Sequence, residues 1–157
     1  MQIYGQPTGP RGYDIIDSPI FAYWMPVLKV VGDVVQYPFA GGYKVHVSVA
    51  LEDAERVAER VLPILQEIKV PHKVVYPLSS YPTMNAGDQK GKFITVYVGP
   101  LMYSFLALVK RLDPLLVEME ATPGPQAMNR ISAHLQPEQR IGLSGLLTYV
   151  IVANYRM

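Results

Sequence analysis

Cysteine is absent from this 157-residue chain, which excludes disulfides, thiol catalysis and cysteine-ligated metal sites. The absence is compatible with a reducing compartment, and we expect a cytoplasmic protein. Long apolar runs are missing too. No stretch of about 18 uninterrupted apolar residues occurs, so a membrane span is not expected. The segment from Met1 to Gly5 lacks the basic and then apolar pattern of a signal peptide.

A large excess of charge is also lacking. The formal net charge is +1, and 17% of the residues are charged. A general nucleic-acid binder would be expected to show a strong basic excess, so the sequence predicts no nucleic-acid partner and no membrane partner. Any site for an anion must therefore be a local cluster of basic side chains.

Motifs for nucleotides, zinc and serine catalysis are missing as well. The chain has no GxxxxGKS/T, no GxGxxG and no histidine pair at i, i+4. Ser48, Ser79 and Ser80 lack the context of a nucleophile elbow. The sequence therefore implies no metal and no organic cofactor, because cations of the protein itself can stabilise a transition state.

Half of the residues are hydrophobic, and the length fits one folded domain. Residues 1–19 hold several glycines and prolines and are expected to form an irregular N-terminal arm, with the domain itself over residues 20–157. Residues 30–35 predict a hairpin with a two-residue turn. Strands that pair across intervening helices predict an α+β fold, a mainly antiparallel twisted sheet with two main helices packed on it.

The remaining elements follow from periodicity. Strands are predicted over 43–49, 70–76, 92–98 and 146–155, the last central in the sheet. Helices are predicted over 52–68 and from Pro100 onward, with Leu101, Phe105, Leu108, Val109 and Leu112 facing the core. Pro63 is expected to kink or interrupt the first helix, and Asp113-Pro114 to start a new helical piece running to about residue 121. Residues 77–91 and 122–142 are expected to be loops.

The strand over 43–49 carries two titratable side chains between its apolar positions. Lys44 and His46 fall on the same face, because side chains alternate along a strand, and lie roughly 6–7 Å apart. An amine and an imidazole at this distance can both reach one small anionic group, such as a leaving phosphate.

Three ordered blocks carry a family resemblance. They are Lys-Val-His-Val-Ser at 44–48, Val-Pro-His-Lys-Val at 70–74 and Gly-Lys-Phe-Ile-Thr-Val-Tyr at 91–97. This pattern resembles the lyase domain at the N-terminus of class III lanthipeptide synthetases. More distantly it resembles the phosphothreonine lyases injected by pathogenic bacteria. The resemblance implies a phosphothreonine lyase-like domain over residues 20–157.

The resemblance also implies the central roles. Lys73 matches the catalytic lysine of the family and is expected to be the base that removes the Cα proton. Like charge and desolvation would lower its pKa toward neutrality. His46 is expected to be the general acid for the leaving phosphate. The other two histidines, His72 and His134, match no role and are expected at the surface.

Further cations are expected to bind the phosphate. Lys44 would act as a point charge, and Lys92 and, with a weaker match, Lys90 would add charge from the third block. Arg140 lies in a segment that resembles the basic-residue-and-glycine segment before the last family strand, and Arg130 is a weaker alternative. In the distant branch arginines do much of the clamping, yet no arginine lies between Arg60 and Arg111 of this chain.

The resemblance thus implies a carbon–oxygen lyase that eliminates phosphate from phosphoserine or phosphothreonine to give dehydroalanine or dehydrobutyrine. The expected substrate is a phosphorylated precursor peptide of lanthipeptide or related biosynthesis, with separate Ser/Thr kinase and cyclase proteins as partners. The alternative is a non-catalytic module of the same fold that binds a phosphorylated or leader peptide and assists a kinase. A lyase directed at host proteins is a third, weaker possibility.

Overall fold

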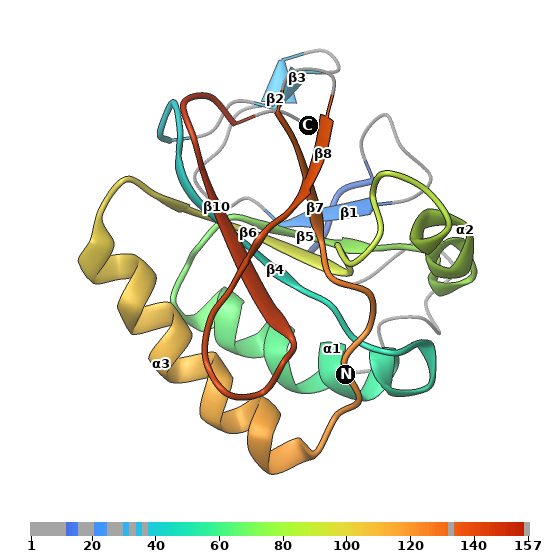
Figure 1. The fold of residues 1–157 in the computed structure, drawn as a ribbon. Coiled ribbons are helices and arrows are strands. Elements are labelled where there is room, and N and C mark those ends of the chain that lie inside the picture. Colours follow the sequence, from blue (N-terminus) through green and yellow to red (C-terminus); the bar gives the residue numbers. More distant parts are fainter. Residues whose placement is uncertain are drawn as a thin grey trace.

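A six-stranded antiparallel sheet forms the centre of the protein (Figure 1). The computed structural model describes residues 12–15, 21–24, 30–31, 34–35, 38–131 and 134–155, without the side chains of 30, 31, 34, 35, 130 and 131. The strand order is β1-β5-β6-β4-β10-β9. The bounds in that order are Phe21–Trp24, His72–Val75, Ile94–Gly99, Gly42–Val47, Leu147–Val152 and Gln139–Arg140. The predicted single α+β domain with a mainly antiparallel sheet is confirmed.

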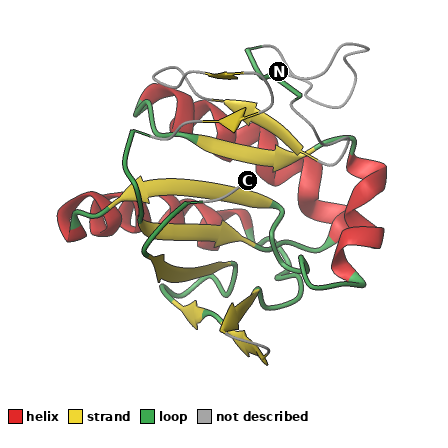
Figure 2. Cartoon of the chain, turned by 90° about the horizontal axis from the view of Figure 1, so that it is seen from above, coloured by secondary structure: helices red, strands yellow, loops and turns green. Residues whose placement is uncertain are grey.

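Two long helices cover one face of this sheet. They are α1 (Leu51–Glu67) and α3 (Met102–Met119), and Figure 2 shows the strands in front of both. Tyr149 of β10 packs on Phe105 of α3, with ring centroids 4.8 Å apart. Because Tyr149 pairs with Val45, the odd-numbered residues of β4 face the helices, and Lys44 and His46 face away from them. No helix in the described ranges has the length and apolar character needed to cross a bilayer.

Both long helices run through an internal proline, which corrects the expected interruption at Pro63 and the expected new start at Asp113-Pro114. Helix α1 continues through Pro63 and α3 continues through Pro114. Each proline lies on the exposed side of its helix, whereas neighbours such as Leu62 and Leu112 are fully buried. Burial of the apolar stripe therefore outweighs the loss of one backbone hydrogen bond at each proline.

Asp113 does not start a new helix. Its carboxylate instead accepts backbone N–H bonds from Leu143 and Ser144, 2.7 and 3.0 Å long, in the loop before β10. A Cβ on Gly142 would lie 2.4 Å from this carboxylate, so only glycine fits between them. Leu101, expected in the core, is the N-cap of α3 and is 62% exposed.

Both predicted loops contain regular structure. Residues 77–91 include a 3-10 turn η1 (Leu78–Ser80) and α2 (Tyr81–Asn85), because the buried Tyr81 hydroxyl donates to the Val49 carbonyl and anchors this turn. Residues 122–142 include strand β9 and a hairpin of β7 (Met128–Ile131) and β8 (His134–Pro137). Polar composition suggested a loop here, but backbone pairing decides the structure.

The early hairpin is confirmed, since β2 (Val30–Val31) pairs with β3 (Val34–Val35). Of the predicted arm, residues 1–11 and 16–19 lie outside the described residues. Its described part packs on the domain, because Asp14 pairs with Tyr23 of β1 and Tyr13 is buried.

Candidate active site

One row of side chains crosses the whole sheet on the face away from the helices. Residues paired between antiparallel strands point to the same face, and neighbouring strands lie about 4.8 Å apart. From β1 to β9 the row contains Tyr23, Lys73, Thr95, His46, Thr148 and Arg140. The Cα atoms of Lys73 and His46 are thus separated by two strand spacings, roughly 10 Å, with Thr95 between them.

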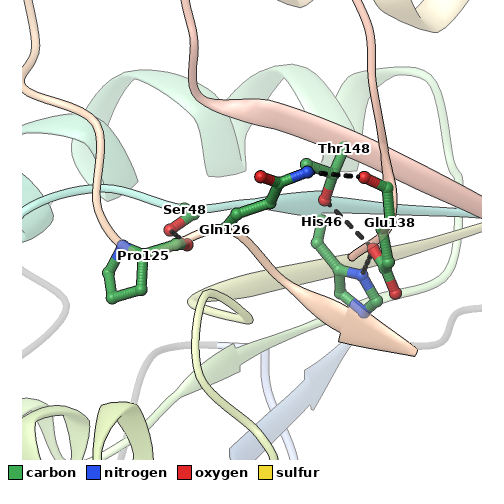
Figure 3. A network of polar contacts seen from close by, with 6 residues as sticks. All are labelled: His46, Ser48, Pro125, Gln126, Glu138 and Thr148. Carbon is green, nitrogen blue, oxygen red and sulfur yellow. Dashed lines mark hydrogen bonds and ion pairs between the residues drawn. The ribbon is translucent and has the colours of Figure 1, made fainter. Parts of the chain in front are cut away.

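His46 is held by a carboxylate (Figure 3). Its Nδ1 donates to Oε1 of Glu138 at 2.6 Å, and the Thr148 hydroxyl donates to the same oxygen at 3.0 Å. The Gln126 amide in turn donates to the Glu138 backbone carbonyl at 2.8 Å. His46 and Glu138 are 1% and 4% exposed. The face of β4 that carries His46 is therefore buried at this residue, although the alternating pattern is that of a strand with only one buried face.

The pair fixes which nitrogen of His46 faces the site. Burial lowers the pKa of His46 to about 4, although the hydrogen bond and charge of Glu138 oppose this shift. Burial would raise the pKa of Glu138, but bonds from His46 and Thr148 and the charge of Lys92 hold it below its usual value. In the free protein the imidazole is therefore neutral with its proton on Nδ1, which leaves Nε2 for another partner.

Lys73 is a buried amine enclosed by aromatic rings. Its Nζ lies 4.0 Å from the ring centroid of Phe21 and 5.6 Å from that of Tyr23, both on β1. Burial, followed by the charges of Lys44 and Lys92, lowers the pKa of Lys73 to about 7. Near neutral pH about half of the Lys73 side chains therefore carry a free amine that can accept a proton.

Lys44 and Lys92 form the more exposed part of this cluster. Both are half-buried, Lys44 two residues before His46 and Lys92 just before β6. Burial lowers the pKa of both amines, and Lys92 adds like charge against Lys44. The negative charge of Glu138 acts on both in the opposite direction. The structure thus brings Lys44, His46, Lys73 and Lys92 together, with Glu138 as counter-charge.

The other predicted phosphate ligands lie outside this cluster. Arg140 is exposed on the edge strand β9 at the end of the row, where its guanidinium donates to Gln126 Oε1 and the Gly145 carbonyl. Lys90 is half-buried in the turn before β6 and is not among the charges that act on Lys73. The side chain of Arg130 is outside the described residues.

His72 is not a surface residue, which corrects the expectation, whereas His134 is exposed as predicted. The His72 ring is fully buried and stacks on Trp24 at 5.2 Å. Its Nδ1 donates to the Val70 carbonyl, and its Nε2 accepts the Tyr13 hydroxyl at 2.8 Å. Every polar atom of the ring is therefore satisfied, and burial lowers its pKa to about 4.

Sequence reasoning missed the partners of the cluster. Glu138 lies between two short strands in a segment read as a loop, so no local pattern marked it. Thr95 is an ordinary β-branched residue of a predicted strand, and no motif includes Phe21 or Tyr23. Only the strand register brings these residues beside Lys73 and His46. No group of three His, Asp or Glu side chains suited to a metal ion occurs in the part of the chain that is described.

Residues 23–131 match the sequence family described as "RamC, N-terminal domain". The chain belongs to this RamC N-terminal domain family. The matched span contains Lys44, His46, Lys73, Thr95 and Lys92 but ends before Glu138 and Arg140. Among proteins of curated function, none matches the sequence significantly.

This member of the RamC N-terminal domain family has a fold shared with bacterial effectors. One is the VirA (SpvC) phosphothreonine lyase effector of Chromobacterium violaceum (TM-score 0.57, 14% identity, 90% of this chain and 66% of that one). Another is the effector and phosphothreonine lyase OspF of Shigella flexneri (0.51, 16%, 88% and 69%). A mutant of the Salmonella plasmid virulence C protein (SpvC) is similar too (0.56, 14%, 92% and 68%). This chain thus spans about two thirds of each effector. At these identities the likeness shows the fold, which is that of phosphothreonine lyases.

Proposed function

We propose that this protein is a carbon–oxygen lyase that eliminates phosphate from phosphoserine or phosphothreonine in a peptide. The observation that carries the proposal is the Lys73 amine, with a pKa of about 7, in the same row as the His46–Glu138 pair on this fold. A base and an acid on the two sides of one bound residue are what β-elimination needs.

In this reaction the neutral Lys73 amine takes the Cα proton, and the electron pair of that C–H bond forms the Cα–Cβ double bond. The Cβ–O bond breaks, and its electron pair leaves with the phosphate oxygen. His46 Nε2–H protonates that oxygen. The products are a dehydroamino acid and phosphate, with Lys73 left as an ammonium. Lys44 and Lys92 hold the phosphate by charge.

His46 has to gain a proton before it can give one. A phosphate beside the ring favours the imidazolium because opposite charge offsets part of the burial penalty, and Glu138 stabilises the same form through Nδ1. A phosphopeptide whose second phosphate pKa is about 6 can bring this proton when it binds as the monoanion. Substrate binding itself thus prepares the acid.

The substrate we propose is a phosphorylated precursor peptide in lanthipeptide or related biosynthesis. Membership of the RamC N-terminal domain family and the likeness of the three sequence blocks to class III lanthipeptide synthetases support this choice. Under this proposal the protein acts in the cytoplasm, with kinase and cyclase activities supplied by protein partners. Arg140, at the exposed end of the row, would contact the peptide outside the phosphate site.

The test is elimination from a synthetic phosphothreonine peptide, followed by mass spectrometry as loss of phosphoric acid. Wild-type protein and the Lys110→Ala variant, a control lysine exposed on α3, should both convert the peptide. Lys73→Ala should bind the peptide but leave it intact. Binding without conversion by the wild-type protein would instead support the non-catalytic peptide-binding module, and full activity of Lys73→Ala would remove Lys73 as the base.

A further inference from the structure

The hydroxyl group of Thr95 is a buried donor that no described residue of the protein pairs with. Thr95 is 1% exposed, and its Oγ1 has no hydrogen-bond partner among the described residues. Buried hydroxyl groups in native proteins are nearly always paired, because an unpaired one loses its water and gains nothing in return. The exception here stands at the centre of the polar row, between Lys73 and His46.

Packing does not account for a threonine at this position. Its neighbours in β6 are Ile94 and Val96, both fully buried. Valine has nearly the same shape as threonine and a high preference for strands, so it would fill the same space without an unpaired hydroxyl. The Glu138 carboxylate does not serve Thr95 either, since it accepts from His46 and Thr148 instead.

We propose that the Thr95 hydroxyl donates a hydrogen bond to a phosphate oxygen of the bound phosphorylated residue, and so holds the phosphate between Lys73 and His46. This inference rests on the proposed function, and it adds a neutral hydroxyl to the charged side chains that hold the phosphate there. Thr95 is a substrate-binding residue in this view, more deeply buried than the cations Lys44 and Lys92.

A neutral donor suits this position better than another cation. A positive charge between Lys73 and His46 would push the pKa of Lys73 further down and oppose protonation of His46, since both already respond to the charges of Lys44 and Lys92. A hydroxyl binds a phosphate oxygen without disturbing either titration. The phosphate is thereby fixed at the centre while the base and the acid keep their own protonation states.

The test compares Thr95→Val, which removes the hydroxyl but keeps the shape, with Thr95→Ser, which keeps the hydroxyl. Affinity is measured for a phosphothreonine peptide by calorimetry in a Lys73→Ala background, where the peptide survives, and for inorganic phosphate by the rise in Tm. A hydrogen bond to a charged group predicts a roughly 10- to 100-fold weaker peptide affinity for Thr95→Val and a value near the parent for Thr95→Ser. The Tm of the free Thr95→Val protein should equal or exceed that of the parent.

Three results would overturn the proposal. They are unchanged peptide affinity in Thr95→Val, a lower Tm of its free form, which would reveal a partner within the protein, and no binding of phosphate or phosphopeptide by the parent. Elimination is measured separately, in protein that keeps Lys73. If phosphopeptide binds through Thr95 but is never converted, this inference stands and the proposed lyase activity falls.

Discussion

Replacing Lys44 with methionine tests whether like charge helps to keep the pKa of the Lys73 amine near 7. The two lysines lie on β4 and β5 with β6 between them and are offset by two residues along the strands, so their Cα atoms are roughly 12 Å apart. At an effective dielectric constant of about 20, two unit charges at such a distance repel by roughly 1.4 kcal/mol, or about one pKa unit. Removing the Lys44 charge should therefore raise the pKa of Lys73 from about 7 to about 8.

The assay is the pH dependence of kcat/KM for elimination, whose rising limb reports the deprotonation of Lys73 in the free enzyme. Loss of a phosphate ligand lowers kcat/KM of Lys44→Met at every pH. Only a changed pKa of Lys73 moves the midpoint of the curve. The substrate peptide is the same throughout, so its own titration contributes equally. Lys110→Met, an exposed control, should keep the wild-type midpoint. A midpoint of Lys44→Met at or below the wild-type value would refute the electrostatic argument.

Three further outcomes are expected. Lys73→Met should stabilise the protein by about 2–4 kcal/mol in chemical unfolding at pH 7, because the folded-state pKa of about 7 lies far below the unfolded value near 10.4. The folded wild type binds fewer protons between these values, so its stability rises with pH there and the advantage of the variant must shrink toward pH 10; a constant advantage would contradict the shift. Glu138→Gln should lower kcat by about 100-fold while the peptide still binds, because the His46 imidazolium loses its counter-charge. An unchanged kcat would show that Glu138 does not support His46 as the general acid. Inorganic phosphate should raise the pKa of His46 above its value of about 4 in an NMR titration, and an unmoved His46 signal would show that the anion binds elsewhere.

The parts of the fold that came from the sequence are those with a local signal. Alternation placed Lys44 and His46 on one face of a strand, and the apolar stripe of α1 gave a helix with nearly the observed bounds. Proline misled in both helices, because a residue pattern does not show that Pro63 and Pro114 lie on exposed helix faces whose neighbours are buried.

The site was predictable only as far as its basic residues. Lys73 carries a motif, but its amine packs on Phe21, about fifty positions away in the chain, and the burial that lowers its pKa depends on such distant contacts. Glu138 reaches His46 across a strand pairing that depends on β9 and β10, and a polar segment rich in proline and glutamine gives no sign of it. His72 was misplaced for the same reason, since its acceptor contact to Tyr13 joins residues 59 positions apart.

The aromatic rings around Lys73 have a consequence for the fate of the product. A dehydroamino acid is an electrophile, and a neutral amine beside it could add to the new double bond and inactivate the protein. In the proposed reaction, however, the amine has just taken the Cα proton and is an ammonium, which has no lone pair to donate. The faces of Phe21 and Tyr23 offset part of the desolvation of that cation, while burial as a whole keeps its pKa near 7 and lets the amine become neutral again for the next turnover. The proton taken from the substrate would thus protect the enzyme from alkylation by what it makes for as long as it stays on Lys73.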